Sequence, residues 1–170
     1  MKTLEFILSR WKKRPLIKLN ITGKYIQCLV DTGAEIPVWC SSEAAFIKRF
    51  PNAELCANKI KISGFGGDGT YHKVYKIPEF RVASTASGGY YTIHNMYCAI
   101  STNADIGYLM ILSASMFYMM DYFVSNTQNR FEVLYSRDDY YMVLDVADKS
   151  LSMFTQDNAS LKSLFSKAEG

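Results

Sequence analysis

The sequence has few of the residues that build metal centres and covalent cross-links. Among its 170 residues are two histidines and four cysteines. The cysteines form no Cys-x-x-Cys pair, and neither histidine stands at metal-ligand spacing from them: Cys28, Cys40, Cys56, Cys98, His72 and His94. Zinc sites are typically marked by such closely spaced ligands. We therefore expect no metal and no cofactor.

Long hydrophobic runs and a strong net charge are also missing. The short apolar run 6–8 is bounded by Glu5 and Arg10, so it offers neither a secretory signal core nor a membrane span. The formal net charge is +3, and the basic segment 10–14 fits a solvated entry to a domain better than a nucleic-acid patch. We expect a soluble protein of the reducing cytoplasm, with no membrane and no nucleic-acid partner.

Apolar and aromatic residues, by contrast, are abundant. Hydrophobic residues make up 49% of the chain, which has 12 Tyr and 10 Phe. This composition opposes disorder and favours strands, and the length suits one domain with a sizeable core. Period-2 patterns and apolar runs predict strands at 3–8, 16–21, 25–30, 60–62, 71–82, 90–93, 96–100, 108–112, 122–124, 131–135 and 140–146. The segments 90–93 and 96–100 are either two strands or one long bent strand.

Helices are predicted at three places. Ser41 or Ser42 caps one over 43–49, and Ser113 or Ser115 caps a methionine-rich one over 116–120. A terminal helix starts near Asn158. A proline inside the apolar run 35–39 predicts an edge strand or a bend.

The turn Asp31-Thr32-Gly33-Ala34 follows a buried-type strand directly. An Asp in this place is usually a simple turn residue, because its side chain bonds the nearby backbone and Gly tolerates the required dihedrals. The importance of Asp31 therefore depends on the residues around it.

A glycine cluster lies about thirty residues later. Gly64, Gly66 and Gly69 satisfy the dinucleotide pattern G-x-G-x-x-G, but that motif needs a helix after the glycines. Here the following segment 71–78 has strand character and ends in a proline. The cluster is therefore interpreted as the flexible tip of a β-hairpin.

The Asp-Thr-Gly-Ala turn, the glycine-tipped hairpin and the apolar strand ending at Ile111-Leu112-Ser113 together resemble the retropepsin-like aspartic proteases. The resemblance covers roughly residues 15–135. It implies a mostly β fold, a single-lobe closed barrel with a glycine-rich flap hairpin, a short helix after the second apolar strand and additional short helices. Residues 1–14 then form an N-terminal extension. Residues 136–170 form a C-terminal extension, with a strand and a terminal helix packed on the same domain.

The resemblance also assigns roles to residues. Asp31 is the catalytic carboxylate, and Thr32, Gly33 and Ala34 form the active-site turn. The flap that closes over a peptide corresponds to Gly64, Phe65, Gly66, Gly67, Asp68 and Gly69. Hydrolysis by this route needs two facing carboxylates that share a proton. The chain has a single Asp-Thr-Gly, so the second carboxylate has to come from another copy in a homodimer.

Two positions depart from related enzymes. Ala34 replaces a Ser or Thr whose hydroxyl stabilises the ionised carboxylate pair, so we expect activity to extend to less acidic pH than in pepsin-like enzymes. Ser113 replaces the Gly that follows the two apolar residues, and Ser is strained there only if the turn needs a positive φ.

The sequence thus predicts a homodimeric aspartic endopeptidase acting on extended, apolar segments of a peptide or protein. The alternative is a retropepsin-like peptide-binding module without proteolytic activity. A β-barrel scaffold with a structural Asp-Thr-Gly turn is a third hypothesis. The intact Asp31-Thr32-Gly33 favours the enzyme, because a binding module has no need of an acid at that place.

Overall fold

The computed structural model describes residues 1–21, 23–34, 36–62, 70–102, 107–145 and 152–156. Strands dominate these ranges, which contain one α-helix and one 3₁₀ helix. The elements are β1 (Lys2–Ile7), β2 (Ser9–Trp11), β3 (Arg14–Ile21), β4 (Lys24–Asp31), β5 (Val38–Trp39), α1 (Glu43–Arg49), β6 (Glu54–Ile62), β7 (Thr70–Ala83), β8 (Tyr90–Ile100), β9 (Met110–Ser113), η1 (Ala114–Phe117), β10 (Asp121–Ser125), β11 (Arg130–Tyr135), β12 (Asp139–Asp145) and β13 (Ser152–Gln156). The predicted mostly β class is confirmed.

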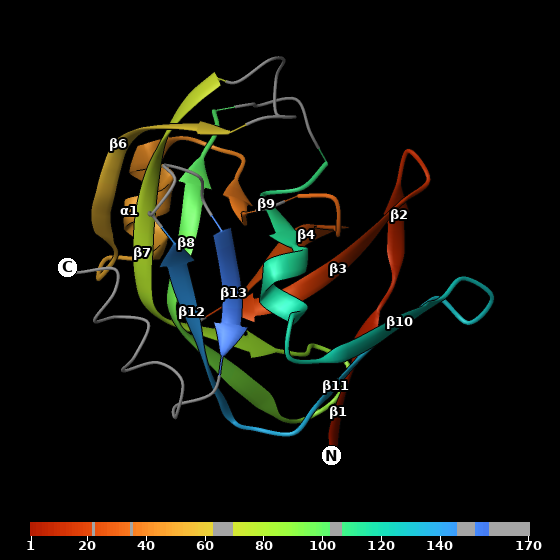
Figure 1. Ribbon diagram of the computed structural model, residues 1–170. Coiled ribbons are helices and arrows are strands. Elements are labelled where there is room, and N and C mark those ends of the chain that lie inside the picture. Colours follow the sequence, from red (N-terminus) through yellow and green to blue (C-terminus); the bar gives the residue numbers. More distant parts are fainter. Residues whose placement is uncertain (22, 35, 63–69, 103–106, 146–151, 157–170) are drawn as a thin grey trace.

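A large sheet of ten strands forms the body of the molecule (Figure 1). Its main path runs β13-β12-β8-β5-β9-β4-β3-β2, and β7 joins β8 to β6 beside this path. Most neighbours are antiparallel, but β4 runs parallel to β9, and β8 runs parallel to both β5 and β12. The β3–β4 hairpin therefore joins the large sheet through β9, whereas the β6–β7 hairpin joins it through β8.

A smaller sheet, in the order β1-β11-β10, lies beside the large one (Figure 1). The N-terminal strand pairs with β11 along its whole length, from Lys2 opposite Tyr135 to Ile7 opposite Arg130. Ser84, the residue after β7, donates a hydrogen bond to the Glu5 carbonyl. These contacts tie residues 1–7 into the folded body.

Aromatic side chains fill the core between α1 and the large sheet. Phe46 of α1 is fully buried, with ring centroids 5.7 Å from Trp39, 5.2 Å from Phe50 and 5.1 Å from Tyr75. Buried aromatic rings at these separations add attraction beyond the area they remove from water. The helix α1 is therefore fixed by its one buried face.

All four cysteines are free thiols. Cys28, Cys40 and Cys98 are buried, and Cys56 on β6 is exposed. Burial raises the pKa of the Cys40 thiol to about 12, and it also raises those of Cys28 and Cys98. The three buried thiols are thus protonated and unreactive near neutral pH.

Two expectations about the fold are only partly met. No closed barrel is found among the described strands: the main path of the large sheet ends at β13 and β2, and β3 meets the segment after β7 through an isolated bridge, Leu19 to Ser84. Of the edge strand or bend expected over 35–39, a bend is present at Ile36, but Val38–Trp39 is not an edge: β5 lies between β8 and β9, and both of its side chains are buried. Pro37 precedes β5, so its missing backbone N–H removes no hydrogen bond from the pairing of that strand.

The helix predicted over 116–120 is instead the four-residue 3₁₀ helix η1. The Ser113 hydroxyl makes no capping bond, because it bonds Ser115, and β10 already begins at Asp121. β13 was not predicted, whereas the predicted helix starting near Asn158 lies outside the described residues. No helix in the described part of the chain is long and apolar enough to cross a membrane.

The N-terminus of α1 provides a matched test. The Ser42 hydroxyl accepts a bond of 3.1 Å from the Ala45 amide, so it is Ser42, not Ser41, that caps the helix. We expect Ser42→Ala to lower the free energy of unfolding by about 1 kcal/mol. The control Ser41→Ala should change it by less than about 0.5 kcal/mol. Urea denaturation of both variants checks this, and equal losses would contradict the assignment of the cap.

Candidate active site

Asp31 is the last residue of β4, at the centre of the large sheet. β4 pairs with β3 on one side and with β9 on the other. Cys28, Leu29 and Val30 are buried, whereas Asp31 is half-buried and Thr32 is exposed. β4 is thus buried up to Val30, and Asp31 at its end is partly exposed to solvent.

Two hydrogen bonds set the turn after β4. The Gly33 amide donates to the Asp31 carboxylate oxygen Oδ1 over 3.0 Å, and the Ala34 amide donates to the Asp31 carbonyl over 3.1 Å. A Cβ added at Gly33 would lie 3.3 Å from the same Oδ1, tighter than an ordinary contact. Glycine therefore lets the backbone approach and orient the carboxylate, as in other turns built on an Asp side chain.

Ser113 lies directly beside the candidate acid. In the parallel pairing of β4 with β9, Asp31 is the register partner of Ser113. Ser113 is fully buried, and its hydroxyl lies 2.6 Å from that of Ser115. Its φ of −97° and ψ of 165° are ordinary extended values, so serine is not strained in place of the family glycine.

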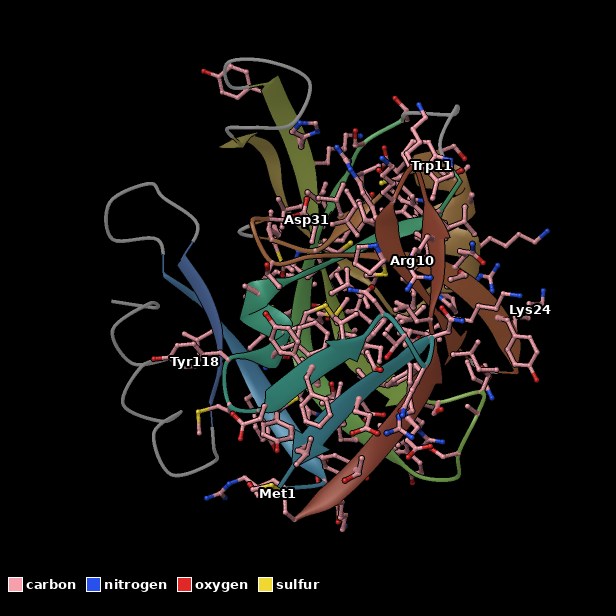
Figure 2. The ribbon with its side chains drawn as sticks, turned by 90° about the vertical axis from the view of Figure 1, so that its right-hand side faces the viewer. Met1, Arg10, Trp11, Lys24, Asp31 and Tyr118 are labelled. Carbon is pink, nitrogen blue, oxygen red and sulfur yellow. The ribbon has the colours of Figure 1, made fainter. Side chains whose placement is uncertain are left out.

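Trp11, Arg14 and Tyr108 form a wall near the turn. The rings of Trp11 and Tyr108 meet edge to face at 5.4 Å, and a Cβ on Gly107 would collide with Trp11 at 2.3 Å. Burial raises the pKa of Tyr108, and the negative charge of Asp31 raises it further. The Arg14 guanidinium, hydrogen-bonded to Tyr108, acts in the opposite direction. Figure 2 shows Trp11 and Asp31 in the same upper part of the molecule.

This wall was not predicted from the sequence. The basic segment 10–14 was expected to be a solvated entry to the domain, and Tyr108 was expected to start a buried strand. In the structure Tyr108 is buried, but it precedes β9, and Trp11 ends β2. The one local signal was Gly107 before Tyr108, because a glycine next to a large aromatic residue can mark a close approach of another side chain.

The glycine-tipped hairpin is only partly described. Its arms are β6 and β7, and the last pair before the tip is Ile62 opposite Thr70. The predicted flap residues Gly64, Phe65, Gly66, Gly67, Asp68 and Gly69 lie outside the described residues. Among the residues that are described, no group of three His, Cys, Asp or Glu side chains could hold a metal ion.

The arrangement on one chain is a single oriented carboxylate at a protein surface. Such a group can take or give one proton. It lacks a second carboxylate from this chain's own Asp-Thr-Gly turn, since that triplet occurs once. Alone, the site therefore supplies half of what a paired-carboxylate hydrolysis requires.

Solved structures share this fold. The crystal structure of a retropepsin-like aspartic protease from Rickettsia conorii matches with a TM-score of 0.52 and 13% sequence identity. The match covers 79% of this chain and 92% of that one. At this identity the likeness shows the fold alone, and the fold is retropepsin-like. No curated protein sequence matches the chain.

The family follows from the sequence match. The model of the retroviral aspartyl protease family matches residues 11–101, which include the Asp31-Thr32-Gly33 turn and both arms of the β6–β7 hairpin. This range spans more than half of the chain. The chain therefore belongs to the retroviral aspartyl protease family.

The buried serine pair beside Asp31 generates a stability prediction. Ser113→Gly removes a buried hydroxyl, leaves Ser115 without its partner and loosens a strand end, so we expect the free energy of unfolding to fall by about 1–3 kcal/mol. Ser113→Ala removes the hydroxyl but keeps the Cβ. Comparing the two variants therefore separates the loss of the hydroxyl from the added backbone freedom of glycine. Chemical denaturation measures both variants. Equal or greater stability of Ser113→Gly would show that serine is a defect at this position.

Proposed function

We propose that the protein is a homodimeric aspartic endopeptidase. A water molecule held between the Asp31 carboxylates of two subunits attacks the peptide bond. The single observation that carries this proposal is the oriented, half-exposed Asp31 at the end of a buried central strand, in a chain of the retroviral aspartyl protease family. The proposed protease domain spans 15–135, with 1–14 and 136–170 as extensions.

Paired carboxylates explain why two copies are needed. One carboxylate accepts a proton from water while the other, protonated, donates to the carbonyl oxygen of the peptide. Two facing acids can hold different charges because each opposes ionisation of the other. With one Asp-Thr-Gly per chain, a two-fold axis between Asp31 and its symmetry mate creates the pair. Thr32 and Gly33 belong to the same turn and support the carboxylate from both subunits.

An extended and apolar peptide segment is the proposed substrate. The flap residues 64–69 cover it from one side, and Ala34 contacts its backbone. The aromatic wall of Trp11 and Tyr108 supports an apolar preference, because it places two large rings near the turn. A cytoplasmic location belongs to the same proposal and is supported by four free thiols.

Replacing the acid tests catalysis directly. We expect Asp31→Asn to lower cleavage of a peptide library by roughly a thousandfold or more, because the amide can neither accept nor relay the proton. The control Asp121→Asn changes an exposed acid on β10 and should leave cleavage unchanged. Saturable peptide binding without cleavage by the wild-type protein would instead favour the non-proteolytic binding module.

Mixing the same variant with wild type tests the dimer. If each active site takes one Asp31 from each subunit, mixed dimers are inactive. Activity per wild-type subunit should then fall to about half at equal amounts and to about a tenth at a ninefold excess of Asp31→Asn. Sedimentation of each mixture checks that subunits exchange. Activity that depends only on the amount of wild-type protein, in exchanging dimers, would exclude a shared site.

Ala34 sets the pH range of the proposed enzyme. A hydroxyl at this position would donate to the ionised carboxylate pair, so the shared proton would be lost at lower pH. We expect Ala34→Thr to move the alkaline limb of the pH–rate profile toward acid by about one pH unit. Ala34→Val, of similar bulk but without a donor, should not move it. A wild-type profile confined below about pH 4 would contradict the proposed role of Ala34.

A further inference from the structure

A second concave site lies at the opposite end of β4 from Asp31. It is a pocket of about 280 Å³ between the start of β4, the segment before α1 and the last turn of α1. Trp39 and Leu109 form its apolar wall, and Lys24, Lys48 and Arg49 line it with positive charge. Lys24 and Asp31 are the first and last residues of an eight-residue strand, so their backbones are roughly 23 Å apart. Figure 2 shows Lys24 far from Asp31.

The charge of this pocket is one-sided. The described residues that line it include three cations and no carboxylate. The nearest acid along α1 is Glu43 in the first turn, and it is already engaged by the Lys73 ammonium at 2.9 Å and by the Tyr75 hydroxyl. The cations come from two different elements, since Lys24 begins β4 and the other two end α1. Convergence of like charges from separate elements favours the binding of an anion.

Arg49 supplies an independent observation. One nitrogen of its guanidinium, Nη1, is buried and has no hydrogen-bond partner. A buried charged donor without an acceptor loses its hydration without compensation, which is among the more costly defects in a folded protein. No carbonyl at the end of α1 accepts a hydrogen bond from this nitrogen. The Phe46 carbonyl there already accepts one from the Phe50 amide at 2.8 Å. Arg49 is one of the residues that line the pocket, so a rotation of its guanidinium would bring this nitrogen to an acceptor bound there.

We propose that this pocket binds the phosphate group of a small molecule. A phosphate offers several acceptor oxygens and up to two negative charges, which match one guanidinium fork and two ammonium groups. The Ser41 hydroxyl lines the same pocket and adds a neutral donor. The volume exceeds that of a bare phosphate, so the apolar wall has room for part of the molecule that carries it. The proposal is independent of the protease function, because none of these residues lies in the Asp31 turn.

The test is a titration of the full chain, followed through its backbone amides by NMR and through heat by calorimetry. The probes are inorganic phosphate, adenosine monophosphate and uncharged adenosine. We expect saturable shifts at Lys24, Ser41 and Lys48 with both phosphate probes and none with adenosine. Tighter binding of the nucleotide than of inorganic phosphate identifies an ester as the source, whereas equal binding identifies free phosphate. Absence of saturable shifts with either phosphate probe in the millimolar range would overturn the proposal.

Variants locate the binding. Arg49→Gln and Lys24→Met should each weaken phosphate binding by roughly tenfold or more, the expected loss for one charge-assisted hydrogen bond. The control Lys18→Met removes an exposed cation of β3 outside the pocket and should leave binding unchanged. Lys24 is exposed, so its variant remains informative if Arg49→Gln folds poorly. Equal weakening by Lys18→Met would show that binding is diffuse attraction to a basic surface, and the proposal would be wrong.

Discussion

The parallel pairing of β4 with β9 is the constraint on which the candidate active site depends. A parallel pair cannot be closed by a tight turn, so the chain between the two strands has to make a long crossover. In this protein the crossover contains β5, α1 and the β6–β7–β8 strands, and it returns to place Ser113 in register with Asp31. The acid is therefore positioned by elements remote in sequence, although its turn is formed locally.

Local patterns were sufficient where local physics decides. The β3–β4 and β10–β11 hairpins, the helix α1 with its serine cap and the long strand β7 follow from alternation, capping and turn residues. The same patterns placed Asp31 correctly after an apolar strand. They could not decide whether serine is tolerated at position 113, because that depends on a backbone angle rather than on a residue type.

What the sequence could not provide depends on tertiary neighbours. The two residues of β5 contain no information on which strands flank them, so an edge strand or a bend was expected where the structure has a central strand. The 3₁₀ helix η1 is short because Ser113 bonds Ser115 instead of capping and because β10 follows at once. Trp11 and Tyr108 are almost a hundred residues apart in the sequence, yet their rings meet, a contact that no local window contains.

The distribution of thiols has a practical consequence. Three cysteines are sealed in the core, and Cys56, on one arm of the glycine-tipped hairpin, is the exposed one. The protein thus carries a natural attachment point for a fluorophore or spin label on the very element proposed to cover the substrate. A label there reports on that hairpin in the unmodified sequence, and a reagent that reacts with more than one thiol per chain reports loss of the native core.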